Sequence, residues 1–258
     1  MISDPARKPR PFLLGLGPAG SFRPFGRCPG RGLSRGVHAG LAGLALLALG
    51  GCVSAIESGP PIANPADLAA RVRTSTSASG PATLRFEWTY ADRRGSVGGQ
   101  GVGRYNPPDS LRVDLFTSGD VAMAIAVAGR ELRSQGEIED VEIPGLEFVY
   151  AMAGLFRPGD GVAEGYTTAS DSVLVYGGVS DRRTYFYVRN GRLRRVEERI
   201  HGRTVQRVNL EWEAPGAWPS EAEFRDLEEH SRVRWRVEGV VSQEESHPAH
   251  VYDLPRVP

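Results

Sequence analysis

The sequence is poor in several residue types, and each shortage narrows what the protein can be. Only two cysteines, Cys28 and Cys52, occur among 258 residues, too few for a disulfide framework or a cysteine-rich zinc site. Lysine occurs once, as Lys8, and we interpret the arginine excess as codon bias. The chain contains no phosphate-binding GxxxxGK[ST] loop. We therefore expect neither an enzyme nor a cofactor or metal.

A net charge of zero hides two unlike regions. Residues 1–51 hold seven basic residues and one acidic residue. Removing these from the totals of 31 and 31 leaves 24 basic against 30 acidic residues in the rest of the chain. A mildly acidic body argues against a nucleic-acid partner.

Residues 1–51 are predicted to be a leader that ends in a signal peptide. Arg31 and Arg35 form a basic region, residues 41–49 an apolar stretch, and residues 50–51 a small-residue cleavage site. The apolar stretch is shorter than the ~20 residues that span a bilayer. Residues 49–52, LGGC, resemble the bacterial lipobox, which implies cleavage before Cys52 and acylation of its thiol. Acylation would leave the mature chain no thiol pair for a disulfide.

The chain after Cys52 divides into a tether and one domain. Residues 52–65 are small, polar and rich in proline, which is typical of a flexible tether. A short amphipathic helix is predicted to begin after Pro65, with Leu68 and Val72 one turn apart. Residues 66–258 form the single predicted domain.

Most of this domain alternates with a period of two. In residues 84–90, LRFEWTY, every second residue is apolar, the pattern of an antiparallel strand with one buried face. A glycine-rich turn is predicted at residues 93–101, and Asn190-Gly191 is the strongest hairpin signal. About eleven strands follow from this pattern. A sheet of that size should curl into an incomplete, half-open β-barrel covered by a few short helices.

Only residues 144–156 break the β pattern in mid-chain. Leu146, Val149, Tyr150, Ala153 and Phe156 recur at helical spacing, so this apolar helix must lie against an apolar surface. A curled sheet covered by such a helix encloses a lipid-sized cavity or a plain core. Alternation alone does not separate the two.

The order of these features resembles the LolA/LolB lipoprotein-carrier superfamily, nearest its lipid-anchored LolB-like side. The features are the lipobox, the short helix, the meander LRVDLF-TSGD-VAMAIAV-AGREL, the mid-chain helix, a second meander rich in arginine and valine, and the terminal HVYDLP. The likeness covers most of residues 66–256. It implies a half-open barrel whose concave face holds acyl chains and passes lipoproteins from a periplasmic carrier to the outer membrane, with no bond made or broken.

The residues that would line this apolar site come from the first strands and the mid-chain helix. They are Leu84, Phe86, Trp88, Val113, Leu115, Met123, Ile125 and Val127 for the wall, with Tyr150 and Phe156 for the lid. The alternative is a structural or interaction lipoprotein of the envelope in which the same residues fill a core. The residue after Cys52 is Val53, whereas an aspartate at this position retains enteric lipoproteins at the inner membrane. We therefore expect the protein at the outer membrane.

Two further features bear on function. LolB-type acceptors carry an exposed apolar side chain on a loop between early strands, whereas the corresponding turn here, residues 117–120, is wholly polar. His247 and His250 have HxxH spacing, but no cysteine or acidic residue completes a metal site in that stretch. We interpret the pair as part of a loop.

Overall fold

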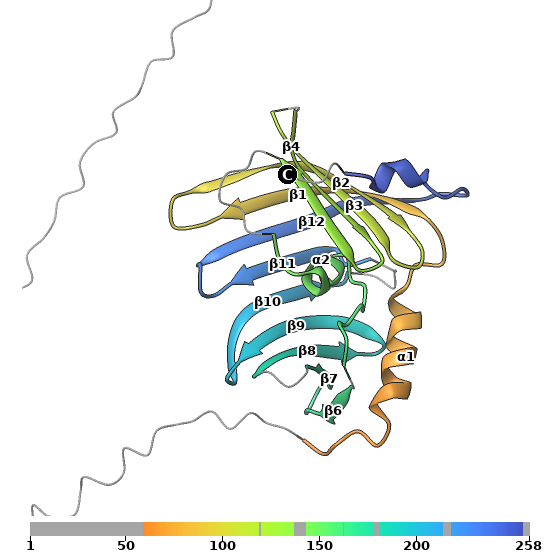
Figure 1. Ribbon diagram of the computed structural model, residues 1–258, viewed down its shortest axis with the longest axis vertical. Coiled ribbons are helices and arrows are strands. Elements are labelled where there is room, and N and C mark those ends of the chain that lie inside the picture. The colour runs from red at the N-terminus through yellow and green to blue at the C-terminus, as the bar shows by residue number, and fades with distance from the viewer. Residues whose placement is uncertain are drawn as a thin grey trace, which may run out of the picture. The chain divides into compact units, whose positions relative to one another are not determined.

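The structure is a computed structural model that describes residues 59–118, 120–136, 143–161, 163–177, 181–213 and 218–254. The predicted leader and Cys52 lie outside these residues. The described part of the chain forms one twelve-stranded antiparallel sheet, two α-helices and a short 3-10 helix (Figure 1).

The first half of the domain is a helix followed by a five-stranded meander. Its elements are α1 (Pro65–Thr76), β1 (Ala82–Ala91), β2 (Ser96–Asn106), β3 (Ser110–Thr117), β4 (Asp120–Ala128) and β5 (Glu131–Gly136). Helix α1 begins as predicted, with Pro65 in its first turn and the Asn64 side chain accepting a hydrogen bond from the Asp67 amide.

The second half contains the mid-chain helix and a seven-stranded meander. Its elements are α2 (Leu146–Met152), β6 (Glu164–Thr167), β7 (Ser172–Tyr176), β8 (Arg182–Arg189), β9 (Arg192–Ile200), β10 (Arg203–Glu211), β11 (Glu221–Asp226), β12 (Ser231–Ser242) and η1 (Ala249–Tyr252). Asn190 and Gly191 both have positive φ, +52° and +71°, and the predicted hairpin there is confirmed.

The strand order places the two ends of the chain's β-region in the middle of the sheet. The order is β5-β4-β3-β2-β1-β12-β11-β10-β9-β8-β7-β6, so β1 pairs with β12 and the edges are β5 and β6. The edges do not pair with each other, and the sheet curls around α2 without closing (Figure 1). The predicted half-open, curled sheet is confirmed, with twelve strands where about eleven were expected.

The prediction of a glycine-rich turn at residues 93–101 was too long, because most of that segment belongs to β2. Only residues 92–95 turn, and Ser96 already pairs with Ala91. The glycines serve packing: a Cβ on Gly101 would lie 2.2 Å from the Phe86 ring. Glycine lets this ring from β1 cover the neighbouring strand.

The core lies on the concave side of the sheet. One cluster of buried apolar residues joins α1, α2 and strands from both meanders. Within the described residues, no helix has the length and apolar character needed to cross a membrane.

Candidate functional site: the concave face and helix α2

All ten residues predicted to form the apolar site lie in this core. Each has 7% or less of its surface exposed, and all belong to the same buried cluster: Leu84, Phe86, Trp88, Val113, Leu115, Met123, Ile125, Val127, Tyr150 and Phe156. The structure therefore brings the predicted residues together. Whether they bind a ligand is a separate question, because burial is equally the property of a core.

Helix α2 is shorter than the predicted helix at residues 144–156. It ends before Gly154, whose φ of +75° is unfavourable for other residues, and a Cβ there would lie 2.9 Å from Trp212 and Pro219. No side chain caps its N-terminus at Gly145. Seven residues are too few for a helix that is stable by itself. Packing against the sheet must hold α2 in place.

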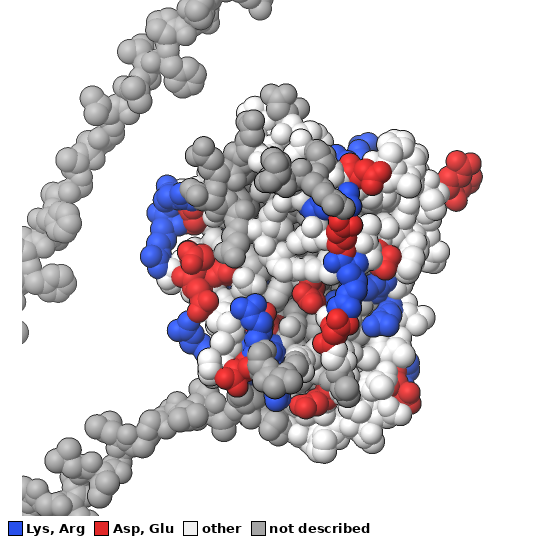
Figure 2. Space-filling model, viewed as in Figure 1, with Lys and Arg blue, Asp and Glu red and all other residues white. Residues whose placement is uncertain are grey.

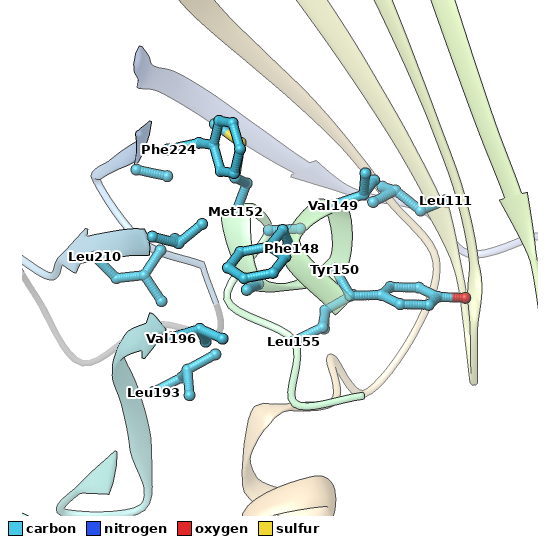
Figure 3. Packing of buried hydrophobic residues seen from close by; sticks show 14 of the residues in the cluster. Leu111, Phe148, Val149, Tyr150, Met152, Leu155, Leu193, Val196, Leu210 and Phe224 are labelled. Carbon is cyan, nitrogen blue, oxygen red and sulfur yellow. The ribbon is translucent and has the colours of Figure 1, made fainter. Parts of the chain in front are cut away.

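Helix α2 packs against both halves of the curled sheet. Its last five residues, Phe148 to Met152, are all buried. Figure 3 shows Phe148 and Met152 on the side of Phe224 and Leu210, in the second meander, whereas Val149 lies beside Leu111 of the first. The Phe148 and Phe224 rings meet edge to face with centroids 5.7 Å apart. In this structure α2 occupies the space in which the sequence predicted a ligand.

Tyr150 ties α2 to the hairpin turns of the first meander. Its ring points away from Phe148 toward β3 (Figure 3), and its hydroxyl lies 3.0 Å from the Gly129 carbonyl and close to that of Asp109. Burial raises the pKa of Tyr150, so the phenol stays protonated and donates. These contacts fix α2 at one end through two backbone acceptors.

An open pocket of about 650 Å³ adjoins α2 at this same end. Its charged lining alternates in sign, with Arg73, Arg130 and Arg157 against Asp109, Glu147 and Asp160. Figure 2 shows the face that carries α2, where arginines and acidic residues are interleaved rather than separated by sign. The pocket is thus a charged opening at the protein surface, next to the buried apolar core.

The segment after α2 is held to α1 by specific hydrogen bonds. The Phe156 amide donates to Thr76 Oγ1 over 3.1 Å, and Arg157 Nη2 donates to Ser77 Oγ over 2.9 Å. Phe156 itself packs edge to face on Phe186, with centroids 5.0 Å apart. Phe156 therefore contacts α1 and β8, although the sequence assigned it to the lid together with Tyr150.

The β3–β4 hairpin ends in the polar turn that departed from the LolB-type pattern. Ser118 is exposed there, with φ of +52°. Val121, three residues later, is 54% exposed. An exposed apolar side chain is thus present beside the turn, although not within it.

The histidines do not form a metal site. His247 lies 3.2 Å from the Ala82 carbonyl and its amide donates to Asn106, while His250 belongs to η1. Across the described ranges, no group of three or more His, Cys, Asp or Glu side chains is arranged to hold a metal ion.

Sequence reasoning missed the second meander's share of the site. Phe224, Leu210, Val196 and Leu193 face α2 but were not among the predicted residues. Strict alternation is broken in both strands, where Leu193 and Val196 are three residues apart. The pairing register shifts at these places, so no simple period revealed which residues face α2. The charged pocket carried no local signal, since it is assembled from five separate segments.

Comparisons with known proteins give likeness in structure only. No protein-family model matches the chain, and the search of curated proteins finds no match. A DUF1329 family protein from Desulfovibrio piger gives a TM-score of 0.50 at 10% identity, over 74% of this chain and 97% of that one. A LolA superfamily protein from Nitrosomonas europaea gives 0.49 at 12% identity, over 74% and 97%. A putative outer membrane lipoprotein-sorting protein domain from Vibrio parahaemolyticus gives 0.47 at 9%, over 71% and 94%.

At such identities a structural likeness concerns the fold alone. The architecture predicted from the sequence is confirmed: an open, curled antiparallel sheet with short helices on its concave side.

Proposed function

We propose that this chain is a lipid-anchored lipoprotein of the bacterial cell envelope that binds the acyl chains of lipoproteins or other lipids. It acts without catalysis in lipid or lipoprotein transfer to the outer membrane, facing the periplasm. Cys52 carries the anchor, and a periplasmic carrier protein is the expected donor of cargo. The observation that supports this best is α2, a short apolar helix in the place that an acyl chain would take.

The energetics favour an exchange between α2 and a lipid chain. Helix α2 is held mainly by buried apolar area, which any apolar group can supply. Each methylene of an incoming chain gains about 0.8 kcal/mol on burial. A long acyl chain can therefore replace the apolar contacts of this seven-residue helix, although not the hydrogen bonds of the Tyr150 hydroxyl.

In this proposal nine of the ten predicted residues keep the roles first assigned to them, whereas Phe156, first assigned to the lid, takes another. The eight from β1, β3 and β4 form the wall, Tyr150 moves with α2 as part of the lid, and Phe156 stays as the fixed floor beside α1. The charged pocket next to Tyr150 is the entrance. Val121, exposed at the β3–β4 hairpin, is the apolar side chain available to contact a membrane during transfer.

A second function is favoured by the same burial. With α2 in place, the concave face is filled by the protein's own side chains. A structural or interaction lipoprotein of the envelope needs no more than such a core. The two functions differ in whether α2 leaves its site.

The carrier function and the filled-core function predict different results for a substitution in α2. Phe148→Ala weakens the packing of α2 and raises the fraction of molecules with an open concave face. If cargo replaces α2, apparent affinity for a fluorescent fatty acid or lipopeptide rises, since apparent affinity scales with the binding-competent fraction. Titration of the full-length Cys52→Ser chain with these probes measures it.

The matched control is Phe186→Ala, which removes an equally buried ring that packs on Phe156 and Tyr176. It lowers stability without loosening α2 directly. If neither the parent chain nor Phe148→Ala takes up a probe, the carrier function is wrong and the filled-core lipoprotein remains.

The anchor is tested in cells with labelled palmitate. The parent chain should incorporate label and Cys52→Ser should not, with Cys28→Ser as the control that leaves labelling intact. Label retained in Cys52→Ser would contradict the assigned acylation site.

A further inference from the structure

A cluster of arginines lies on the face of the sheet opposite α2. We call it the arginine cluster: Arg183 of β8, Arg195 and Arg199 of β9, and Arg207 of β10. It surrounds Glu197, whose side chain is 1% exposed. The concave site uses none of these residues.

Glu197 is shared by three of the four guanidinium groups. Arg199 Nη2 lies 2.6 Å from its Oε2, Arg207 Nε 2.9 Å from its Oε1, and Arg195 Nε 3.4 Å from its Oε1. One carboxylate compensates one positive charge, so this group keeps an excess of two. Arg183 pairs with Glu164 at 3.3 Å, and both side chains are about half exposed or more.

Two of the guanidinium groups lie over tyrosine rings. Arg195 lies 3.9 Å from the centroid of Tyr187, and Arg199 lies 4.4 Å from that of Tyr185. Such stacking fixes the orientation of side chains that are otherwise flexible. A ligand that binds here meets donors that are already ordered.

The strand register opposes like charges at the cluster. Arg199 is the direct cross-strand partner of Arg183, and Arg207 is that of Arg225 in β11. Like charges directly opposite each other destabilise a sheet. An anion bound beside these arginines would offset their repulsion. The free energy of this register would then be lower with the anion bound than without it.

The described chain begins along edge strand β6, in the same meander as the arginine cluster. The Ile62 amide donates to the Gly165 carbonyl, and the Thr167 amide to that of Pro60, so the end of the predicted tether runs along edge strand β6. From Gly59 back to Cys52 seven residues reach at most about 25 Å. Strands β8 to β10 lie two to four places from β6, or about 10–19 Å at 4.8 Å per strand.

We propose that the arginine cluster binds the phosphate groups of an anionic phospholipid membrane and sets how the domain lies on it. This proposal rests on the anchor at Cys52 in the proposed function, because the anchor holds the β6 edge within reach of the bilayer. Guanidinium groups match phosphate oxygens in geometry and charge. The short tether makes the membrane the polyanion that this face meets at highest local concentration.

Vesicle co-sedimentation tests the proposal without the anchor. Full-length chains with Cys52→Ser are mixed with vesicles of phosphatidylcholine alone, or with phosphatidylglycerol in equal parts. The test variant is Arg183→Gln with Arg207→Gln, which leaves Arg195 and Arg199 to satisfy Glu197. Since each arginine near an anionic surface contributes about fivefold, binding to the mixed vesicles should fall about 25-fold.

The control is Arg85→Gln with Arg93→Gln: both arginines are exposed, Arg85 lies in β1, three strands from β10, and Arg93 in the turn that follows β1. It removes the same charge and should change binding by less than about threefold. The proposal is wrong if both variants lose vesicle binding equally, or if binding does not depend on phosphatidylglycerol. An acidic protein would then be the partner of this face. The parent chain and both variants keep the apolar residues 41–49. Any insertion of this stretch into the vesicles therefore contributes equally to their binding and cancels in the comparison. Because none is acylated, the outcome is independent of palmitate labelling and of fatty-acid uptake.

Discussion

Glu197 and Glu198 are neighbours in β9, yet their surroundings act on them in opposite directions. Burial raises the pKa of both, but around Glu197 the guanidiniums of Arg199, Arg195 and Arg207 outweigh it, and the pKa is lowered. On the α2 side burial prevails, Arg182 opposes it only in part, and Glu147 adds repulsion, so the pKa of Glu198 is raised.

The two faces of the sheet are therefore organised by different forces. The face opposite α2 stabilises charge through shared ion pairs at β8–β10, whereas the concave face is stabilised by apolar area and raises the free energy of a charge placed on it. This difference matches the two binding surfaces proposed above, one for acyl chains and one for phosphate groups. The predictions below test it from the largest expected effect to the smallest.

The largest loss should come from the concave face. Phe86 is 1% exposed and stacks on Trp235 with centroids 4.9 Å apart. Phe86→Ala should lower the free energy of unfolding by about 4 kcal/mol, through lost burial and a cavity. Urea unfolding measures it, with Val173→Ala, a buried change on the opposite face, expected to cost less. Equal costs would remove the contrast between the faces.

Removing the shared carboxylate should be nearly as costly. Glu197→Gln leaves three guanidiniums without their counter-ion, and we expect a loss of about 3 kcal/mol in urea unfolding. Added sulfate should restore part of it. The control is Glu223→Gln, whose partner Arg225 is half exposed and whose loss should be about 1 kcal/mol. A neutral Glu197→Gln would mean that the cluster contributes nothing to folding.

The opposite pKa shifts predict opposite pH dependences. The lowered pKa of Glu197 contributes stability above its unfolded value of 4.5, and this is lost as pH falls through the folded value. The raised pKa of Glu198 means that protonation stabilises the fold, so stability is lost as pH rises from 4.5 through the folded value.

Unfolding free energies between pH 3 and 7 should therefore separate the variants. Glu198→Gln should abolish the loss on rising pH, and Glu197→Gln the loss on falling pH. Parallel profiles for the two variants would show that the faces do not differ in this respect.

The smallest effect should come from an ion pair outside both surfaces. Arg130 and Asp160 pair at 2.5 Å, but their side chains are 67% and 85% exposed. Arg130→Gln should leave the unfolding midpoint unchanged, because solvent screens such pairs. A clear shift would mean that the pocket rim contributes to stability as well as the two faces.

Features that depend on neighbouring residues were predicted well from the sequence. Features that depend on long-range contacts were predicted less well. The alternation of residues 84–90, the Asn190-Gly191 turn and Pro65 each act through neighbours in the chain, and each was interpreted correctly. Strand β6 was missed because its four residues, one of them glycine, are too few to show a period. The length of α2 depends on Trp212 and Pro219 lying close to Gly154, which no local pattern reveals.

The site divides in the same way. The ten apolar residues could be predicted because each alternates or repeats within its own segment. The arginine cluster could not, since cross-strand register decides which charges face each other.

The pairing of β1 with β12 has a kinetic consequence. Each meander joins strands that follow one another in the chain, so both can form from nearby contacts. The β1–β12 pairing, here called the seam, closes a loop that runs from Ala82 to Ser242. Closing this loop costs chain entropy before the contacts between β1 and β12 have formed to stabilise it. Folding should therefore be limited by this seam, and substitutions along it should slow refolding more than equally destabilising ones at the edges β5 and β6.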